Sequence, residues 1–262
     1  MKFRDAAAIV VLSFLPALAH AAGMAHDENF IVIASDEALA EDVLAKANQY
    51  RKEVAEEWLG AELPPSVGRA IIDVHIADDD QGRTWVIDAP DRKHHMLWLN
   101  TTRQGALGGM LRHELTHAIL ATELPGLLPA WADEGAASLA DDEERVEIRR
   151  QTIAWFSRTG NWPHLATIFA ASSIVASDKA SYAVSASLAE YLLSRGDKPR
   201  FLKFAVEGKS QGWARALRAH YQIESMAELE HGWQSWASDA STATVGETND
   251  SSGRRSNLSD RR

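Results

Sequence analysis

The chain has 262 residues, of which 45% are hydrophobic and 24% charged, so collagen-like, wholly disordered and coiled-coil proteins are excluded. Its 37 acidic and 27 basic residues give a formal net charge of −10, which argues against nucleic acid or an anionic membrane surface as a partner. The absence of cysteine excludes disulfides, thiol catalysis and cysteine-ligated zinc, so any metal site must use His, Asp or Glu.

The first segment has the pattern of a secretory signal peptide. Two basic residues precede an apolar run over residues 6–19, and Ala19-His20-Ala21 supplies a small-x-small cleavage pattern. The alternative is a membrane anchor, but about 14 apolar residues interrupted by Pro16 are fewer than the ~20 that span a bilayer. We therefore expect residues 1–21 to be removed, with cleavage after Ala21 or Ala22. The mature protein is then periplasmic or secreted and has no stable membrane anchor.

Residues 22–237 are predicted to form one domain, with strands first and helices second. The strand-rich region covers residues 28–100, with strands expected at 30–34, 70–76, 84–88 and 96–100. A helix is expected from Leu39 to Trp58, with Ser35 as its N-cap and Gly60 at its end. From residue 102 to about 237 the pattern is helical, so the fold class is α+β. Residues 238–262 are rich in Ser, Thr, Asp and Asn, and we expect a disordered tail.

The most informative motif is the pentapeptide His113-Glu114-Leu115-Thr116-His117. On a helix, two histidines four residues apart project from one face and can bind one metal ion. Glu114 lies about 100° round the helix from His113, so it can reach a metal-activated water without ligating the metal. The alternative is a surface helix, but the apolar residues around the motif favour a buried helix, in which three such polar groups need a partner.

A third metal ligand is expected from the segment that follows. A catalytic zinc has three protein ligands and one open position, and without cysteine the third must be His, Asp or Glu. Pro129 suits the start of a second helix, in which Glu134 is the preferred third ligand. Asp133 is the alternative ligand, and its other possible role is to accept a hydrogen bond that orients a histidine. The small residues 135–137 would let this helix pack closely on the first.

Four segments carry a resemblance to a known family: HELTHAIL, LPAWADEGAASLA, SYAVSASLAEYLLSRG and ALRAHYQIESMAELEHGWQSW. Together they resemble the peptidase MA-like gluzincin zinc metallopeptidases over residues 107–237, roughly half of the chain. The resemblance implies a zincin-like fold and one zinc ion per chain, bound by His113, His117 and Glu134. It also implies that Glu114 is the general base, and that the strand before the active-site helix, here residues 96–100, lines the cleft, where an extended substrate can pair with it.

The reaction that follows is hydrolysis of a peptide bond in a peptide or protein substrate. Zinc polarises the scissile carbonyl, and Glu114 accepts a proton from the zinc-bound water and passes it to the leaving amine. A second group must stabilise the developing oxyanion, and Tyr182 is the candidate because it opens the next helix that matches the family. His164 and His231 are the alternatives.

Two hypotheses from different classes remain at this point. The first is an exported zinc metallopeptidase. The second is a catalytically inactive, peptidase-like binding or assembly factor of the cell envelope, for which Glu114 would be dispensable. A further acidic run, residues 141–144, is interpreted as a solvated helix face with pairs such as Asp141–Arg145 rather than as a calcium site.

Overall fold

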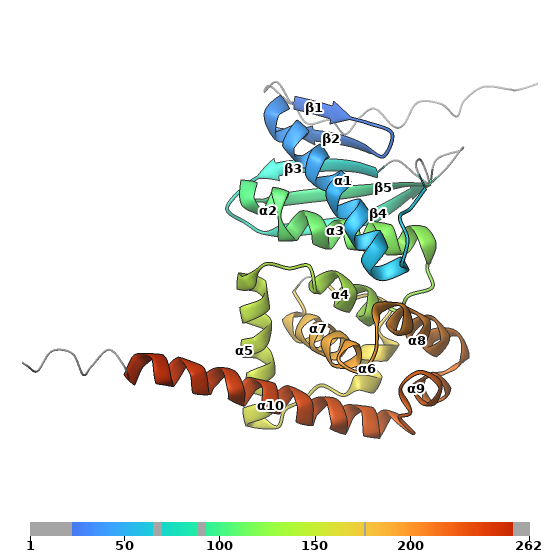
Figure 1. Ribbon diagram of the computed structural model, residues 1–262, viewed down its shortest axis with the longest axis vertical. Helices are drawn as coiled ribbons and strands as arrows, with labels where there is room; N and C mark the ends of the chain where they lie inside the picture. Colours follow the sequence, from blue (N-terminus) through green and yellow to red (C-terminus); the bar gives the residue numbers. More distant parts are fainter. Residues whose placement is uncertain (1–22, 65–69, 89–92, 176, 254–262) are drawn as a thin grey trace, which may run out of the picture.

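The computed structural model describes residues 23–64, 70–88, 93–175 and 177–253 (Figure 1). The predicted signal peptide, residues 1–21, and the end of the predicted tail, residues 254–262, lie outside the described residues. The fold is α+β, as predicted, because a small mixed sheet precedes a mostly helical second half.

The sheet has five strands in the described residues: β1 (Gly23–His26), β2 (Phe30–Ala34), β3 (Ala70–Ile76), β4 (Gln81–Asp88) and β5 (Lys93–Thr101). Their order is β1-β2-β3-β5-β4, with β2, β3 and β5 parallel and both outer strands antiparallel to their neighbours. The strand predicted at 96–100 therefore lies inside the sheet, between β3 and β4. The expectation that an extended substrate can pair with this strand is wrong, because β4 folds back on β5 and takes the edge position.

One face of the sheet is covered by helices. Alternate residues of the central strands are buried there, including Ile72, Leu97 and Leu99, as the two-residue period of a strand requires. Helices α1 (Glu37–Leu59) and α3 (Gly109–Glu123) pack on this face. Helix α1 ends at Gly60 as predicted, but its N-cap is Asp36, which accepts a hydrogen bond from the backbone N–H of Leu39, rather than Ser35.

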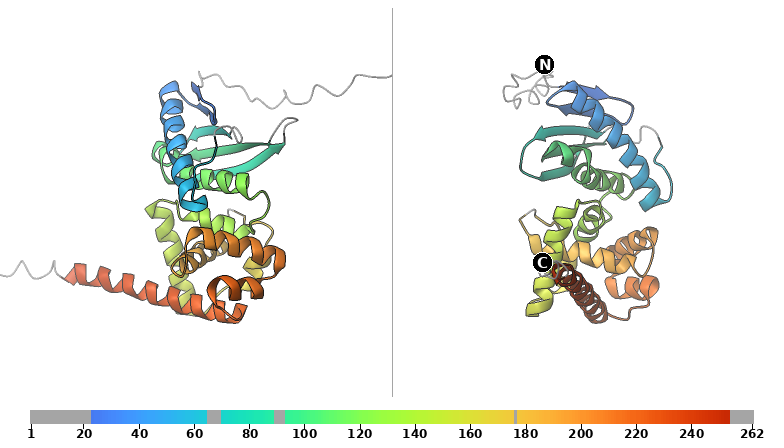
Figure 2. Two further views of the ribbon diagram at one scale, coloured as in Figure 1. Left: turned by 45° about the vertical axis from the view of Figure 1, so that its right-hand side comes forward. Right: turned by 60° about the vertical axis from the view of Figure 1, so that its left-hand side comes forward.

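The remaining helices follow the sheet, and most of them form the second half of the molecule (Figures 1 and 2). They are α2 (Arg103–Leu107), α4 (Ala130–Ser138), α5 (Glu143–Thr159), α6 (Leu165–Ala170), α7 (Lys179–Leu193), α8 (Lys198–Gln211), α9 (Trp213–Tyr221) and α10 (Met226–Gly253). Their core contains an aromatic cluster in which the fully buried Trp131 of α4 stacks on Phe169 of α6, with ring centroids 4.5 Å apart. This packing holds the start of α4 in the helical half, directly after the segment that connects α4 to α3.

The last helix is longer than the sequence pattern predicts. The composition predicts disorder from Ser238, but α10 continues to Gly253 and extends beyond the rest of the helical half (Figure 2). The segment 238–253 contains no proline, and adding residues to a helix that is already docked needs no new nucleation. Among the described helices, none combines the length and the apolar character needed to cross a membrane.

Candidate metal centre

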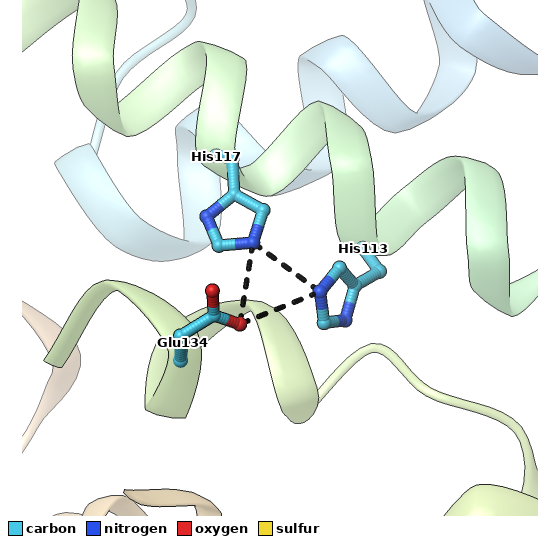
Figure 3. A group of neighbouring side chains, drawn as sticks. All are labelled: His113, His117 and Glu134. Carbon is cyan, nitrogen blue, oxygen red and sulfur yellow. Dashed lines mark hydrogen bonds and ion pairs between the residues drawn. The ribbon is translucent and has the colours of Figure 1, made fainter. Parts of the chain in front are cut away.

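Helices α3 and α4 bring three potential metal ligands together (Figure 3). His113 and His117 lie one turn apart on α3, and their Nε2 atoms are 3.2 Å apart. Glu134 approaches from α4, and its Oε2 atom lies 3.9 Å from Nε2 of His113 and 3.7 Å from Nε2 of His117. The three residues predicted as ligands from the sequence thus converge on one point between the two halves of the molecule.

The geometry of this triad fits a zinc ion. Nitrogen or oxygen ligands about 2.0–2.1 Å from a tetrahedral ion lie about 3.3 Å from one another. The observed separations of 3.2–3.9 Å are close to that spacing. In the part of the chain that the structure describes, Oε2 of Glu134 is buried without a hydrogen-bond partner. A buried carboxylate oxygen without a hydrogen-bond partner is costly, and a cation bound at this point would offset that cost.

Each histidine is oriented by a carboxylate at its other ring nitrogen. Nδ1 of His117 lies 3.0 Å from Oδ2 of Asp133, the role that the sequence suggested for Asp133. Nδ1 of His113 lies 2.8 Å from Oδ1 of Asp141, and this partner was not predicted. Such hydrogen bonds present Nε2 to a metal and make the imidazole a better ligand.

The structure corrects the interpretation of the acidic run. The Asp141–Arg145 pair is present at 3.4 Å, but the Asp141 side chain is only 3% exposed and is not part of a solvated face. Its second oxygen accepts a hydrogen bond from Arg149, which also donates to the backbone oxygen of Ser138 at 2.9 Å. Asp141 is therefore a buried carboxylate between His113 on one side and two arginines on the other.

The electrostatics of the site favour positive charge at its centre. Burial lowers the pKa of His117, but Asp133, Glu134 and Glu114 together raise it to about 10. Burial raises the pKa of Glu134 above its usual range, although the two histidines oppose this shift. In the metal-free protein a proton on His117 therefore balances part of the negative charge, and a divalent cation would take its place.

Asp141 shows the opposite behaviour. Burial alone would raise its pKa, but the ion pair and hydrogen bond with His113 and the charges of Arg149 and Arg145 lower it to about 2. The carboxylate is thus ionised at all physiological pH values. This acceptor at Nδ1 orients the His113 ring so that Nε2 faces the other two ligand atoms.

Glu114 is buried beside the triad, with 4% of its surface exposed. The Oγ1 hydroxyl of Thr84, on strand β4, lies 2.7 Å from Oε2 of Glu114 and 3.1 Å from its backbone oxygen. Gly82, two residues earlier on the same face of β4, lies so close that a methyl group there would stand 2.2 Å from Oε1 of Glu114. The sequence did not single out either β4 residue, because their roles depend on where the edge strand lies.

Tyr182, at the start of α7, lies beside Glu134. Burial and the Glu134 carboxylate raise the pKa of the Tyr182 phenol well above its usual value, so the hydroxyl remains a hydrogen-bond donor at neutral pH. The two alternatives lie elsewhere. The His164 side chain is 84% exposed and pairs with Glu230, and His231 is exposed on α10.

Gly135 is one of the small residues that were predicted to let α4 pack closely on α3, but its close contact is with another helix. Gly135 packs against α7 rather than α3, because a methyl group there would stand 2.6 Å from the backbone oxygen of Ser185 and 3.0 Å from Cβ of Ala189. The contact between α4 and α7 places Glu134 and Tyr182 on facing helices. Gly135 therefore allows α4 to approach α7 closely next to the third ligand, Glu134.

Comparisons with known proteins add no assignment: neither a scan against protein-family models nor searches of the curated proteins and of the solved structures found a match. The functional interpretation therefore depends on the geometry and chemistry of this site.

Proposed function

We propose that this chain is a zinc-dependent metallopeptidase with a zincin-like fold of the gluzincin type, exported through the signal peptide predicted at residues 1–21. One observation carries the proposal: three ligand atoms from two helices converge at 3.2–3.9 Å, and one of them is a buried carboxylate oxygen with no hydrogen-bond partner among the described residues. Such a set of two imidazoles and one carboxylate is typical of catalytic zinc, which keeps a further position open.

His113, His117 and Glu134 would hold the ion, and Asp141 and Asp133 would orient the two histidines. Zinc, when bound, supplies a Lewis acid that polarises a carbonyl group and acidifies water. The protein contributes fixed ligands in a largely buried setting, since the side chains of His113 and Glu134 are 7% and 16% exposed.

The remaining steps belong to side chains of this chain. Glu114 adjoins a ligand without being one, so its carboxylate accepts a proton from the attacking water and returns it to the leaving amine. Tyr182 keeps its proton at neutral pH and is our candidate donor to the oxyanion. The free edge of β4 is the site that we propose for an extended peptide, because this strand pairs only with β5 in the described residues.

The competing hypothesis, a catalytically inactive binding or assembly factor, requires no general base. The structure gives Glu114 a dedicated hydrogen bond from another element, at 2.7 Å, in a buried position next to the ligand cluster. An arrangement of this kind is costly to maintain for a residue without a role, and it supports the enzyme over the binding factor.

The test compares Glu114→Gln with a matched control, Glu123→Gln, on the exposed end of the same helix. Both zinc-loaded variants and the unmodified protein are incubated with a labelled unfolded protein and a mixed peptide library. Glu114→Gln should retain about one zinc per chain and lose hydrolysis by at least about 100-fold, the contribution of a general base. Undiminished hydrolysis in Glu114→Gln would show that the assigned mechanism is wrong, whereas no hydrolysis by any form would favour the binding factor.

A further inference from the structure

The carboxylate of Glu114 is held by the sheet rather than by its own helix. The only side-chain hydrogen bond that the described residues give this carboxylate comes from Thr84 of β4, at 2.7 Å. The same hydroxyl lies 3.1 Å from the backbone oxygen of Glu114, and since a hydroxyl has one proton, the nearer acceptor Oε2 takes it. Thr84 and Glu114 are 30 residues apart in the sequence, so only the packing of β4 on α3 brings them together.

Gly82 supports the other side of the same carboxylate. Register with β5 places Gly82 and Thr84 on the face of β4 that looks toward α3, opposite the buried Leu99 and Leu97. An added methyl group at Gly82 would stand 2.2 Å from Oε1 of Glu114 and 2.5 Å from Sδ of Met110. The backbone of β4 therefore approaches one carboxylate oxygen while Thr84 holds the other. Together these contacts restrict the Glu114 carboxylate to one position.

We propose that Thr84 is a positioning residue for the general base, Glu114, and that the close backbone contact at Gly82 fixes the other side of the Glu114 carboxylate. This inference rests on the proposed function insofar as it concerns catalysis. The edge strand would then have two tasks, since the strand that offers its free edge to a substrate also fixes the carboxylate that removes the proton. A misplacement of about 1 Å in such a group can lower the rate about 100-fold.

A structural role for Thr84, joining β4 to α3, is the alternative. Thr84→Val keeps the shape and removes the hydroxyl, and Thr84→Ser restores it. Thr122→Val is the matched control, because Thr122 lies on α3, donates to the backbone oxygen of Ala118 and contacts His95 of β5, away from Glu114. If Thr84 has only a structural role, Thr84→Val and Thr122→Val should both lower the melting temperature, and both should leave kcat unchanged.

The experiment measures kcat, KM and zinc content for these variants and for Gly82→Ala, and determines crystal structures of their metal-free forms. We expect Thr84→Val to lower kcat about 10- to 100-fold, the effect of losing one hydrogen bond to a carboxylate, with KM and zinc content unchanged. Gly82→Ala should lower kcat as well, because it displaces the carboxylate from the other side. Thr84→Ser should restore kcat to within about threefold, and the Glu114 carboxylate should be displaced in Thr84→Val and in place in Thr84→Ser.

Retention of kcat by Thr84→Val, a loss that Thr84→Ser does not restore, or an unmoved Glu114 carboxylate in the Thr84→Val crystal would overturn the proposal. If even the unmodified protein hydrolyses no substrate, the proposed function fails, and the crystal structures alone decide the positioning role. In that case a displaced carboxylate in Thr84→Val upholds it, and an unmoved one refutes it.

Discussion

Replacing Asp141 by asparagine tests whether this buried carboxylate prepares the metal site. The substitution keeps the size of the side chain and removes the charge that His113 and Arg149 share. Loss of a carboxylate that orients a metal-binding histidine weakens metal affinity about 10- to 100-fold. That factor corresponds to about 1.4–2.7 kcal/mol of binding free energy.

The same substitution should destabilise the metal-free protein. The pKa of Asp141 falls from 3.8 to about 2 on folding, which corresponds to about 2 kcal/mol of stability from the ionised carboxylate. Because the folded-state pKa is the lower one, this contribution is fully present above about pH 4 and is lost as the pH falls toward 2. The difference in unfolding free energy between Asp141→Asn and the unmodified protein should therefore be largest near neutral pH and shrink below pH 4.

The assays are competition with a chelating dye for zinc affinity and urea denaturation of the metal-free protein for stability. Asp142→Asn is the matched control, because Asp142 is the N-cap of α5, and asparagine caps a helix as well as aspartate does. The control should leave zinc affinity unchanged. An Asp141→Asn variant that binds zinc within about twofold of the unmodified protein would refute the orienting role that we assign to this residue.

Two further predictions follow from the site. Because the pKa of His117 is raised to about 10 in the metal-free protein, zinc binding at pH 7 should release at least about one proton, so zinc affinity should increase with pH. Calorimetry in buffers of different ionisation enthalpy measures this release, and its absence would contradict the assigned protonation. Gly135→Ala should lower the unfolding free energy by about 1–3 kcal/mol, because the added methyl group meets the backbone oxygen of Ser185 at 2.6 Å. Urea denaturation tests this, and an unchanged midpoint would show that α4 and α7 can separate at little cost.

The ligand set could be predicted from the sequence because it depends on local spacing. The four-residue interval between His113 and His117 needs only a helix, and Glu134 follows on the next helix after a short connection. The role of Asp133 was also accessible, since it is adjacent to Glu134 and can accept from a histidine. The structure brings all of these side chains to one place, whereas zinc binding and peptidase activity stay predictions.

The supporting residues could not be predicted because they depend on tertiary packing. In the sequence Asp141 cannot be distinguished from its acidic neighbours, and only the turn after α4 brings its carboxylate to Nδ1 of His113. Thr84 and Gly82 gain their contacts with Glu114 because β4 folds back as the outer strand, a matter of strand order that hydrophobic periodicity does not encode. Strand β1 was missed for a similar reason, since its four residues form a strand only by pairing with β2.

The central claim is that His113, His117 and Glu134 form a zinc site, and the most direct test is the metal content of the purified protein. Elemental analysis after exposure to zinc at neutral pH and dialysis should find about one zinc per chain. The zinc should be absent from His117→Ala and retained in His164→Ala, which removes an exposed histidine far from the triad in sequence. A protein that binds no zinc under these conditions, or a His117→Ala variant that retains it, would contradict the account.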